Sequence, residues 1–180
     1  MDFSGLSDMY FSTAGQTCRI LEPTAGACSI ILKDAMSFSS YTCHADQDLS
    51  GNLIEDRQGQ TWIAFDFCRG LNQPYFIGSV YKARLTTLSR FDTTTRDNIG
   101  RQGNKPTLIY PSLPLHIKQT VGTTETTPDR QSSILRYKSI TLSGYDIRPA
   151  DLITSNGGLL KVLDVSKLFN GISELFLQSM

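Results

Sequence analysis

Charge, lysine and long apolar runs are all scarce in this sequence. Charged residues make up 19% and hydrophobic residues 39% of its 180 residues, below the roughly 25% and 45–50% of average globular chains. No stretch reaches the ~18 consecutive apolar residues of a membrane-spanning helix. The sequence also lacks the charged heptads of a coiled coil and the regular glycines of collagen. These absences exclude three classes and leave a globular chain, whose aromatic residues can build a core.

A secretory signal is missing as well. It would need positive charge followed by an apolar run, whereas the first residues include Asp2 and Asp8. We therefore expect the protein in the cytoplasm during synthesis. The cysteines are irregularly spaced and form no C-x-x-C pair, at Cys18, Cys28, Cys43 and Cys68. Free thiols are expected, although an even number would also permit two disulfides.

Alternation of apolar and polar residues with a period of two is the dominant pattern. Within 60–68, apolar side chains recur at Ile63, Phe65 and Phe67, which is typical of a half-buried strand. A β-branched run at 28–33 predicts another strand. Asn156 and Gly157 predict a tight hairpin turn, and the polar residues 92–107 predict a long loop.

Two longer alternating runs predict a hairpin over 113–147. Their apolar residues are Leu113, Leu115, Ile117, Ile134, Ile140 and Leu142. The segment 122–132 between them is polar and contains Pro128, which is typical of a mobile tip. Since a strand rises about 3.3 Å per residue, the hairpin is expected to project from a compact body.

The C-terminal residues 166–177 predict a helix. Apolar residues recur there at helical spacing, at Leu168, Phe169, Ile172, Leu175 and Phe176. Gly171 inside the stretch costs roughly 1 kcal/mol relative to alanine, so the helix is expected to dock on a surface. Together these patterns predict a mainly β fold, a β-sandwich or partly open barrel with a long projecting hairpin and a C-terminal helix. One domain over 1–180 is expected, because no repeat or linker is visible.

The net charge of zero conceals an uneven distribution. Residues 1–66 hold nine acids and three bases, and residues 67–150 hold five acids and twelve bases. Patches of opposite sign attract a second copy head to tail, unless the two halves interleave and mix their charges on one surface. A nucleic-acid partner is not expected, because acids lie among the bases and the sequence pI is about 6.7.

The stretch 46–52 is the most specific local motif. Side chains with oxygen atoms occupy alternate positions, at Asp46, Asp48, Ser50 and Asn52. This spacing resembles the opening of a calcium loop, but Arg57 stands where the loop needs a bidentate glutamate. A structural calcium site is one interpretation, and a turn held by side-chain-to-backbone hydrogen bonds is the favoured one. No other cofactor is expected.

Trp62, Tyr75 and Tyr81 form a second candidate site, a platform for stacking on a sugar or another ligand. The spacing of Trp62 and Asp66 and the segment 72–80 that follows resemble the W-x-x-x-D and P-x-x-I-x-x-V pattern of discoidin-like β-sandwiches. The resemblance implies a ligand-binding module. The competing interpretation, that these aromatic residues fill the core, is favoured.

Enzyme motifs are absent from the sequence, which contains no phosphate-binding glycine loop and no G-x-S-x-G elbow. A thiol nucleophile at Cys43 or Cys68 and a zinc site are weak alternatives. The neighbours Cys43 and His44 point to opposite faces of a strand, and no metal-ligand spacing occurs. No enzyme is therefore expected.

A hydroxyl-rich β chain with seven lysines, a projecting hairpin and divided charge resembles small virion proteins of tailed phages, of the tail-tube, tail-adaptor or baseplate kind. The resemblance implies a structural protein located in the virion, whose partners are copies of itself and other virion proteins. Assembly is expected to pair residues 113–121 and 134–145 of neighbouring copies. The helix residues Phe169, Ile172 and Phe176 are expected to dock. A carbohydrate- or ligand-binding module is the alternative.

Overall fold

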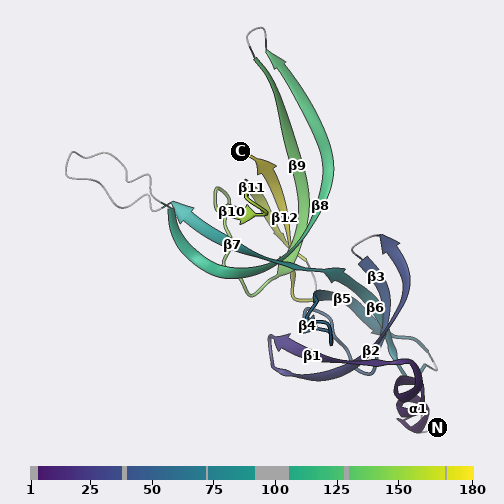
Figure 1. Ribbon diagram of the computed structural model, residues 1–180. Helices are drawn as coiled ribbons and strands as arrows, with labels where there is room; N and C mark the ends of the chain where they lie inside the picture. The colour runs from purple at the N-terminus through teal and green to yellow at the C-terminus, as the bar shows by residue number, and fades with distance from the viewer. Residues whose placement is uncertain (1–3, 38–39, 72, 92–105, 128–129, 169) are drawn as a thin grey trace. The chain divides into compact units, whose positions relative to one another are not determined.

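The computed structural model describes residues 4–37, 40–71, 73–91, 106–127, 130–168 and 170–180 (Figure 1). Contacts divide the chain into two compact units. Unit 1 comprises Met1–Ala83, Leu142–Gly144 and Lys167–Ile172, and unit 2 comprises Arg84–Thr141, Tyr145–Ser166 and Ser173–Met180. Neither the composition nor a linker in the sequence signals this division.

Unit 1 is a closed antiparallel barrel preceded by a helix. Its strands follow the order β1-β2-β3-β6-β5-β4, and β4 pairs with β1 to close the barrel. Its elements are α1 (Ser4–Ala14), β1 (Gln16–Glu22), β2 (Gly26–Ser37), β3 (Ser40–Ala45), β4 (Leu53–Glu55), β5 (Thr61–Arg69) and β6 (Phe76–Lys82). The helix ends at a glycine, where the Gly15 backbone N–H donates to the Phe11 carbonyl at 2.9 Å.

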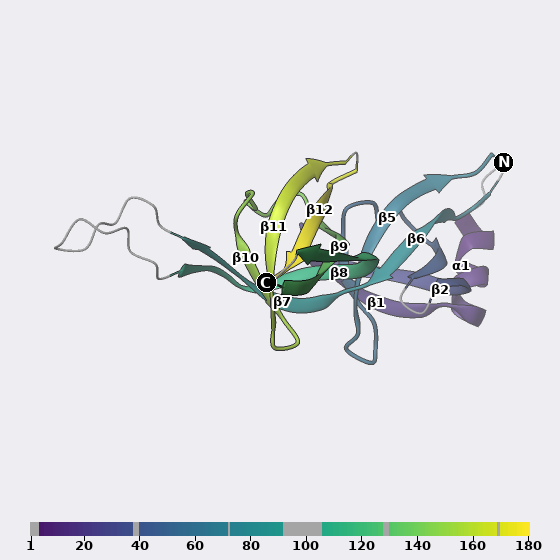
Figure 2. The same ribbon diagram turned by 90° about the horizontal axis from the view of Figure 1, so that it is seen from above.

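Unit 2 is a second closed barrel, with the order β10-β11-β12-β9-β8-β7 and β10 paired with β7. Its elements are β7 (Arg84–Phe91), β8 (Pro106–Thr127), β9 (Arg130–Leu142), β10 (Leu152–Ser155), β11 (Gly158–Lys167) and β12 (Ile172–Ser179). Figure 2 shows β8 and β9 side by side, as Figure 1 does.

The two barrels have the same topology. Adding six to every strand number of unit 1 reproduces the strand order of unit 2, so that β1 corresponds to β7, β2 to β8 and β3 to β9. Two differences stand out. The helix α1 precedes β1, whereas only Ala83 lies between β6 and β7. In addition, β8 has 22 residues where β2 has 12, and β9 has 13 where β3 has 6.

Each barrel surrounds its own apolar core, because closing a sheet turns alternate side chains inward. In β5 the core of unit 1 takes Trp62, Ala64 and Phe67. The change of phase between Ala64 and Phe67 coincides with a register shift between Phe65 and Cys68. A β-bulge of this kind changes which residues face inward. Phe67 therefore faces the core with Trp62 and Ala64, whereas the simple alternation read from the sequence placed it on one face with Ile63 and Phe65.

The prediction of a mainly β fold is confirmed, and the prediction of a helix at 166–177 is wrong. This stretch contains most of β12, which lies between β11 and β9. Ile172, Leu175 and Leu177 are fully buried while Phe176 is exposed. Positive φ angles at Asn170 and Gly171 make the turn that enters the strand. The helix α1 at the other end of the chain was not predicted.

Two further predictions concern turns. The tight turn is confirmed, since Ser155 pairs with Gly158 and Asn156 and Gly157 have φ angles of 49° and 77°. Of the predicted tip 122–132, residues 122–127 and 130–132 are paired strand instead, and residues 128–129 lie outside the described residues. The predicted loop 92–107 falls mostly on residues 92–105, which also lie outside them, and Pro106 begins β8.

Candidate functional site

The strand β8 changes its partner along its length. Its first part pairs with β7, from Phe91↔Pro106 to Arg84↔Leu115. Its second part pairs with β9, from His116↔Ile140 to Thr127↔Arg130. Because β7 begins at Arg84, it does not follow β8 beyond Leu115. From there β8 and β9 continue as a ribbon that has no β7 on one edge, and this ribbon runs past the ends of β10 and β12 (Figure 1).

The edge of β9 that faces away from β8 is partly covered by β12. The Ser179 hydroxyl accepts a hydrogen bond of 3.1 Å from the Leu135 backbone N–H. Lys138 Nζ lies 2.8 Å from the Glu174 carboxylate and 5.9 Å from the centre of the Phe176 ring. Because β12 ends at Ser179, it follows β9 only as far as Leu135.

Four of the nine side chains predicted to carry assembly are buried. Leu113, Leu115 and Ile172 are fully buried, and Leu142 is 5% exposed. Ile117 and Ile140 are partly buried. These side chains stabilise the fold and offer little surface to another copy. The side chain of Ile134 and the whole of Phe169 lie outside the described residues.

Phe176 differs, because 38% of it is exposed. It belongs to a set of exposed apolar side chains on β11, on β12 and at the C-terminus, together with Leu159, Leu163 and Met180. The Met180 backbone N–H donates to the Leu159 carbonyl at 3.1 Å, so these two residues lie on adjacent segments.

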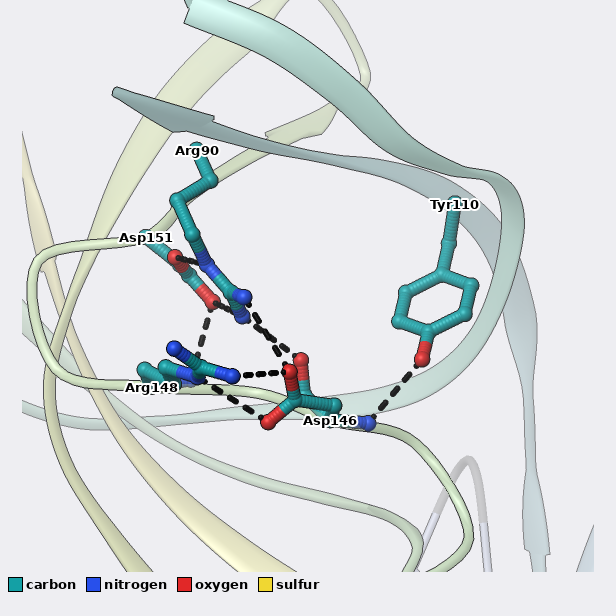
Figure 3. A network of polar contacts seen from close by, with 5 residues as sticks. All are labelled: Arg90, Tyr110, Asp146, Arg148 and Asp151. Carbon is teal, nitrogen blue, oxygen red and sulfur yellow. Dashed lines mark hydrogen bonds and ion pairs between the residues drawn. The ribbon is translucent and has the colours of Figure 1, made fainter. Parts of the chain in front are cut away.

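A polar network anchors the turn between β9 and β10 (Figure 3). Arg90 Nε and Nη2 donate to the two carboxylate oxygens of Asp151 at 2.7 and 2.9 Å. Arg90 Nη1 also donates to the Asp146 carboxylate, which Arg148 contacts with Nε at 3.1 Å and Nη2 at 2.8 Å. On the far side, the Asp146 backbone N–H donates to the Tyr110 hydroxyl at 3.1 Å.

The electrostatics of this network favour its charged form. The hydrogen bond to Asp151 raises the pKa of Arg90 above its usual value. Arg148 and then Arg90 lower the pKa of Asp146 to about 2. Asp146 is therefore ionised at neutral pH, and its hydrogen bonds to both guanidinium groups hold the turn. Asp146, Arg148 and Asp151 are close in sequence, but nothing in the sequence indicates Arg90 as their partner.

The stretch 46–52 is a turn held by its own side chains. Asp46 Oδ2 accepts from the Ser29 backbone N–H at 3.0 Å, and Asp48 Oδ1 accepts from the Ser50 backbone N–H at 2.9 Å. The Ser50 hydroxyl accepts from the Phe67 backbone N–H, and Asn52 Nδ2 donates to the Ser50 carbonyl. Among the described residues there is no group of three or more His, Cys, Asp or Glu arranged to hold a metal ion.

The aromatic residues of the second candidate do not form one platform. Trp62 is only 6% exposed, and its indole N–H donates to Asp56 Oδ2 at 3.0 Å. Tyr75 stacks on His44 with ring centres 4.5 Å apart, whereas Tyr81 lies 6.3 Å from Phe65. Trp62 therefore offers almost no ring face to a ligand.

Three of the four cysteines are buried and one is exposed. Burial raises the pKa of Cys18 to about 11 and that of Cys28 to about 12, and it also raises the pKa of Cys43. These thiols are protonated at neutral pH and are poor nucleophiles. Cys68 is exposed, and its nearest charged neighbours along β5 are Asp66 and Arg69.

No family model matches this chain, and no curated protein matches it significantly. The described part of the chain contains no helix long and apolar enough to cross a membrane.

Proposed function

We propose that this protein is a non-enzymatic structural protein that assembles with copies of itself into a ring or tube, as a virion component of the phage tail or baseplate kind. The observation that carries the proposal is the β8–β9 ribbon beyond Leu115. A closed barrel leaves no strand edge, whereas a ribbon that leaves the barrel presents unpaired backbone groups. Such an edge binds a further strand by β-augmentation.

The comparison of the two barrels supports the proposal. Both have the same strand order, yet only unit 2 carries the long ribbon. Barrel closure therefore does not require the additional residues of β8 and β9. A feature that the fold does not need is more readily explained by a contact with another molecule.

The distribution of charge supplies a second argument. Unit 1 holds six bases and nine acids, and unit 2 holds eleven bases and eight acids, for net charges of −3 and +3. Opposite charges on two parts of one chain attract a neighbouring copy head to tail. Such a contact weakens at high salt, because the Debye length falls to about 3 Å at 1 M.

The test is deletion of residues 122–132. Val121 and Arg136 are paired across the ribbon, so residues 133–135 remain to close a short loop and both barrels stay intact. We expect the deletion variant to keep the far-ultraviolet circular dichroism of a β protein and to sediment as a monomer. The wild-type chain should form a larger species that electron microscopy shows as rings or tubes. A monomeric wild-type chain at low and high salt would contradict the proposal.

A further inference from the structure

Beyond Leu115, the strands that the structure describes leave one edge of β8 unpaired. We propose that residues 117–127 of β8 pair antiparallel with the same residues of a second copy, so that two ribbons join into one four-stranded sheet across a two-fold axis. The inference rests on the proposed function and names the strand and the symmetry of one of its contacts.

The two halves of β8 differ in their ability to accept another strand. The strand β9 ends at Leu142, so no described strand lies beside the edge of β8 before Pro114 on that side. This first half contains Pro106, Pro111 and Pro114, and prolines block strand addition because they lack a backbone donor. Residues 117–127 contain no proline and only one lysine, Lys118. The strand β8 therefore has a first half whose prolines oppose strand addition and a second half, 117–127, that can accept another strand.

Unit 1 shows what covers the corresponding place in the first barrel. There β2 also outruns its neighbour, because its pairing with β1 stops at Gln16↔Ile30 while β2 continues to Ser37. The helix α1, which leads directly into β1, packs against β2, and Lys33 Nζ lies 5.5 Å from the centre of the Tyr10 ring. In unit 2 only Ala83 precedes β7. Among the described residues of unit 2 no helix corresponds to α1, which leaves this edge of β8 available to another molecule.

The lengths of the free edges identify that partner. With respect to the described strands, the edge of β8 is free over eleven residues, 117–127, whereas β9 extends only five residues beyond Leu135, at 130–134. Two copies of β8 match each other in length, and antiparallel edges are self-complementary because donors and acceptors alternate along each. Full overlap places residue 122 of one copy opposite residue 122 of the other. This isologous contact closes after two copies, and a ring then needs the head-to-tail charge attraction in addition.

A cross-linking experiment tests the geometry. Gly122→Cys is prepared with Cys68→Ser, which removes the exposed thiol, and the matched control carries Ser133→Cys on β9 instead. Mild oxidation with copper phenanthroline removes one hydrogen atom from each of two thiols and joins them as a disulfide. We expect the Gly122→Cys chain to form covalent dimers at least tenfold faster than the control, because facing strand positions lie within disulfide range. Equal rates would overturn the inference. Efficient cross-linking only in a mixture of the two variants would also overturn the inference, because it would indicate that β8 of one copy pairs with β9 of another.

A variant with one added positive charge on β8 separates this inference from the proposed function. Gly122→Lys places two like charges opposite each other in the dimer, whereas Ser133→Lys adds the same charge to β9. We expect Gly122→Lys to weaken self-association at least tenfold by sedimentation equilibrium, with an unchanged melting temperature, and Ser133→Lys to have a much smaller effect. If the wild-type chain associates and Gly122→Lys leaves its mass unchanged, the inference fails while the proposed function stands. If the wild-type chain is a monomer, both fail.

Discussion

Arg90 on β7 and Asp151 before β10 form a two-point ion pair, with Nε 2.7 Å from Oδ1 and Nη2 2.9 Å from Oδ2. Asp151 is 1% exposed. Its Oδ2 also accepts from the Arg148 backbone N–H, and its carbonyl accepts from the Val162 backbone N–H. Through its carboxylate and its carbonyl, Asp151 therefore connects β7, the turn before β10 and β11 within unit 2.

Replacing Arg90 by alanine should destabilise the protein strongly. The change leaves the Asp151 carboxylate buried without its cation, and breaking one side of a buried ion pair costs about 3–5 kcal/mol. Arg148→Ala is the matched control, since the Arg148 side chain is 63% exposed and exposed pairs contribute about 1 kcal/mol or less. Urea denaturation followed by circular dichroism measures both free energies of unfolding. Equal losses would mean that Asp151 does not depend on Arg90.

Replacing Gly51 by alanine should destabilise the protein more than replacing Gly59 by alanine, although the two glycines have similar backbone angles. Gly51 and Gly59 have φ angles of +74° and +77°, a conformation that costs other residues roughly 1–2 kcal/mol. A Cβ atom on Gly59 would meet open space, whereas one on Gly51 would lie 2.5 Å from the Asn170 carbonyl oxygen. Gly51→Ala should therefore lose a further 1–3 kcal/mol or so. Thermal melting of both variants checks the difference, and equal melting temperatures would show that Gly51 and Asn170 are not in contact.

The cysteines should separate into one accessible and three protected thiols. Only Cys68 is exposed, so a disulfide reagent such as DTNB is expected to label one thiol per native chain and four in denaturant. Rapid labelling of Cys18 or Cys28 without denaturant would contradict their burial.

The same thiols make stability depend on alkaline pH. Burial raises the pKa of Cys18 from its ordinary value of 9.0 to about 11 and that of Cys28 to about 12. Above pH 9 the unfolded chain loses these protons while the folded chain keeps them, so the free energy of unfolding falls as pH rises from 9 toward 11. Cys28→Ala should reduce this slope between pH 9 and 10 in urea titrations, and an unchanged slope in this variant would contradict the prediction.

The docking of α1 should weaken in acid. His44 on β3 shares a hydrogen bond of 2.9 Å with the Tyr10 hydroxyl, and burial followed by the charge of Lys33 lowers the pKa of His44. A group with a lowered pKa is neutral in the folded state where the unfolded state already binds a proton, so stability falls as pH drops below the ordinary value of 6.5. Proteolysis within α1 should be faster at pH 5 than at pH 7. His44→Gln, which cannot titrate, should remove most of that difference, and a difference that persists in this variant would assign it to another group.

Local patterns predicted the parts of the fold that depend on neighbouring residues. The mainly β class, the strand at 60–68 and the turn at Asn156 and Gly157 follow from alternation and from residues that tolerate positive φ. The 46–52 turn was also anticipated as one of two interpretations, because Asp48 bonds to a backbone group only two residues away. Each of these features is decided within a few residues of the chain.

The features that depend on distant partners could not be predicted in this way. The apolar residues at 168–176 fit a helix and a strand alike, and the place of β12 between β11 and β9 decides for the strand. Phe67 was expected on one face with Ile63 and Phe65, but a bulge opposite β6 brings it to the core. Arg90 meets Asp151 across a separation of 61 residues, and no spacing rule connects them.

The amino-acid sequence by itself determined that this protein is rich in strands, that it carries few charges and that those charges are divided along the chain. Only the tertiary structure decided that the strands close into two barrels of the same order, and that one barrel extends into a ribbon with a free edge. The physical reason is that strand propensity and alternation are properties of neighbouring residues, whereas barrel closure and free edges depend on which distant strands exchange backbone hydrogen bonds.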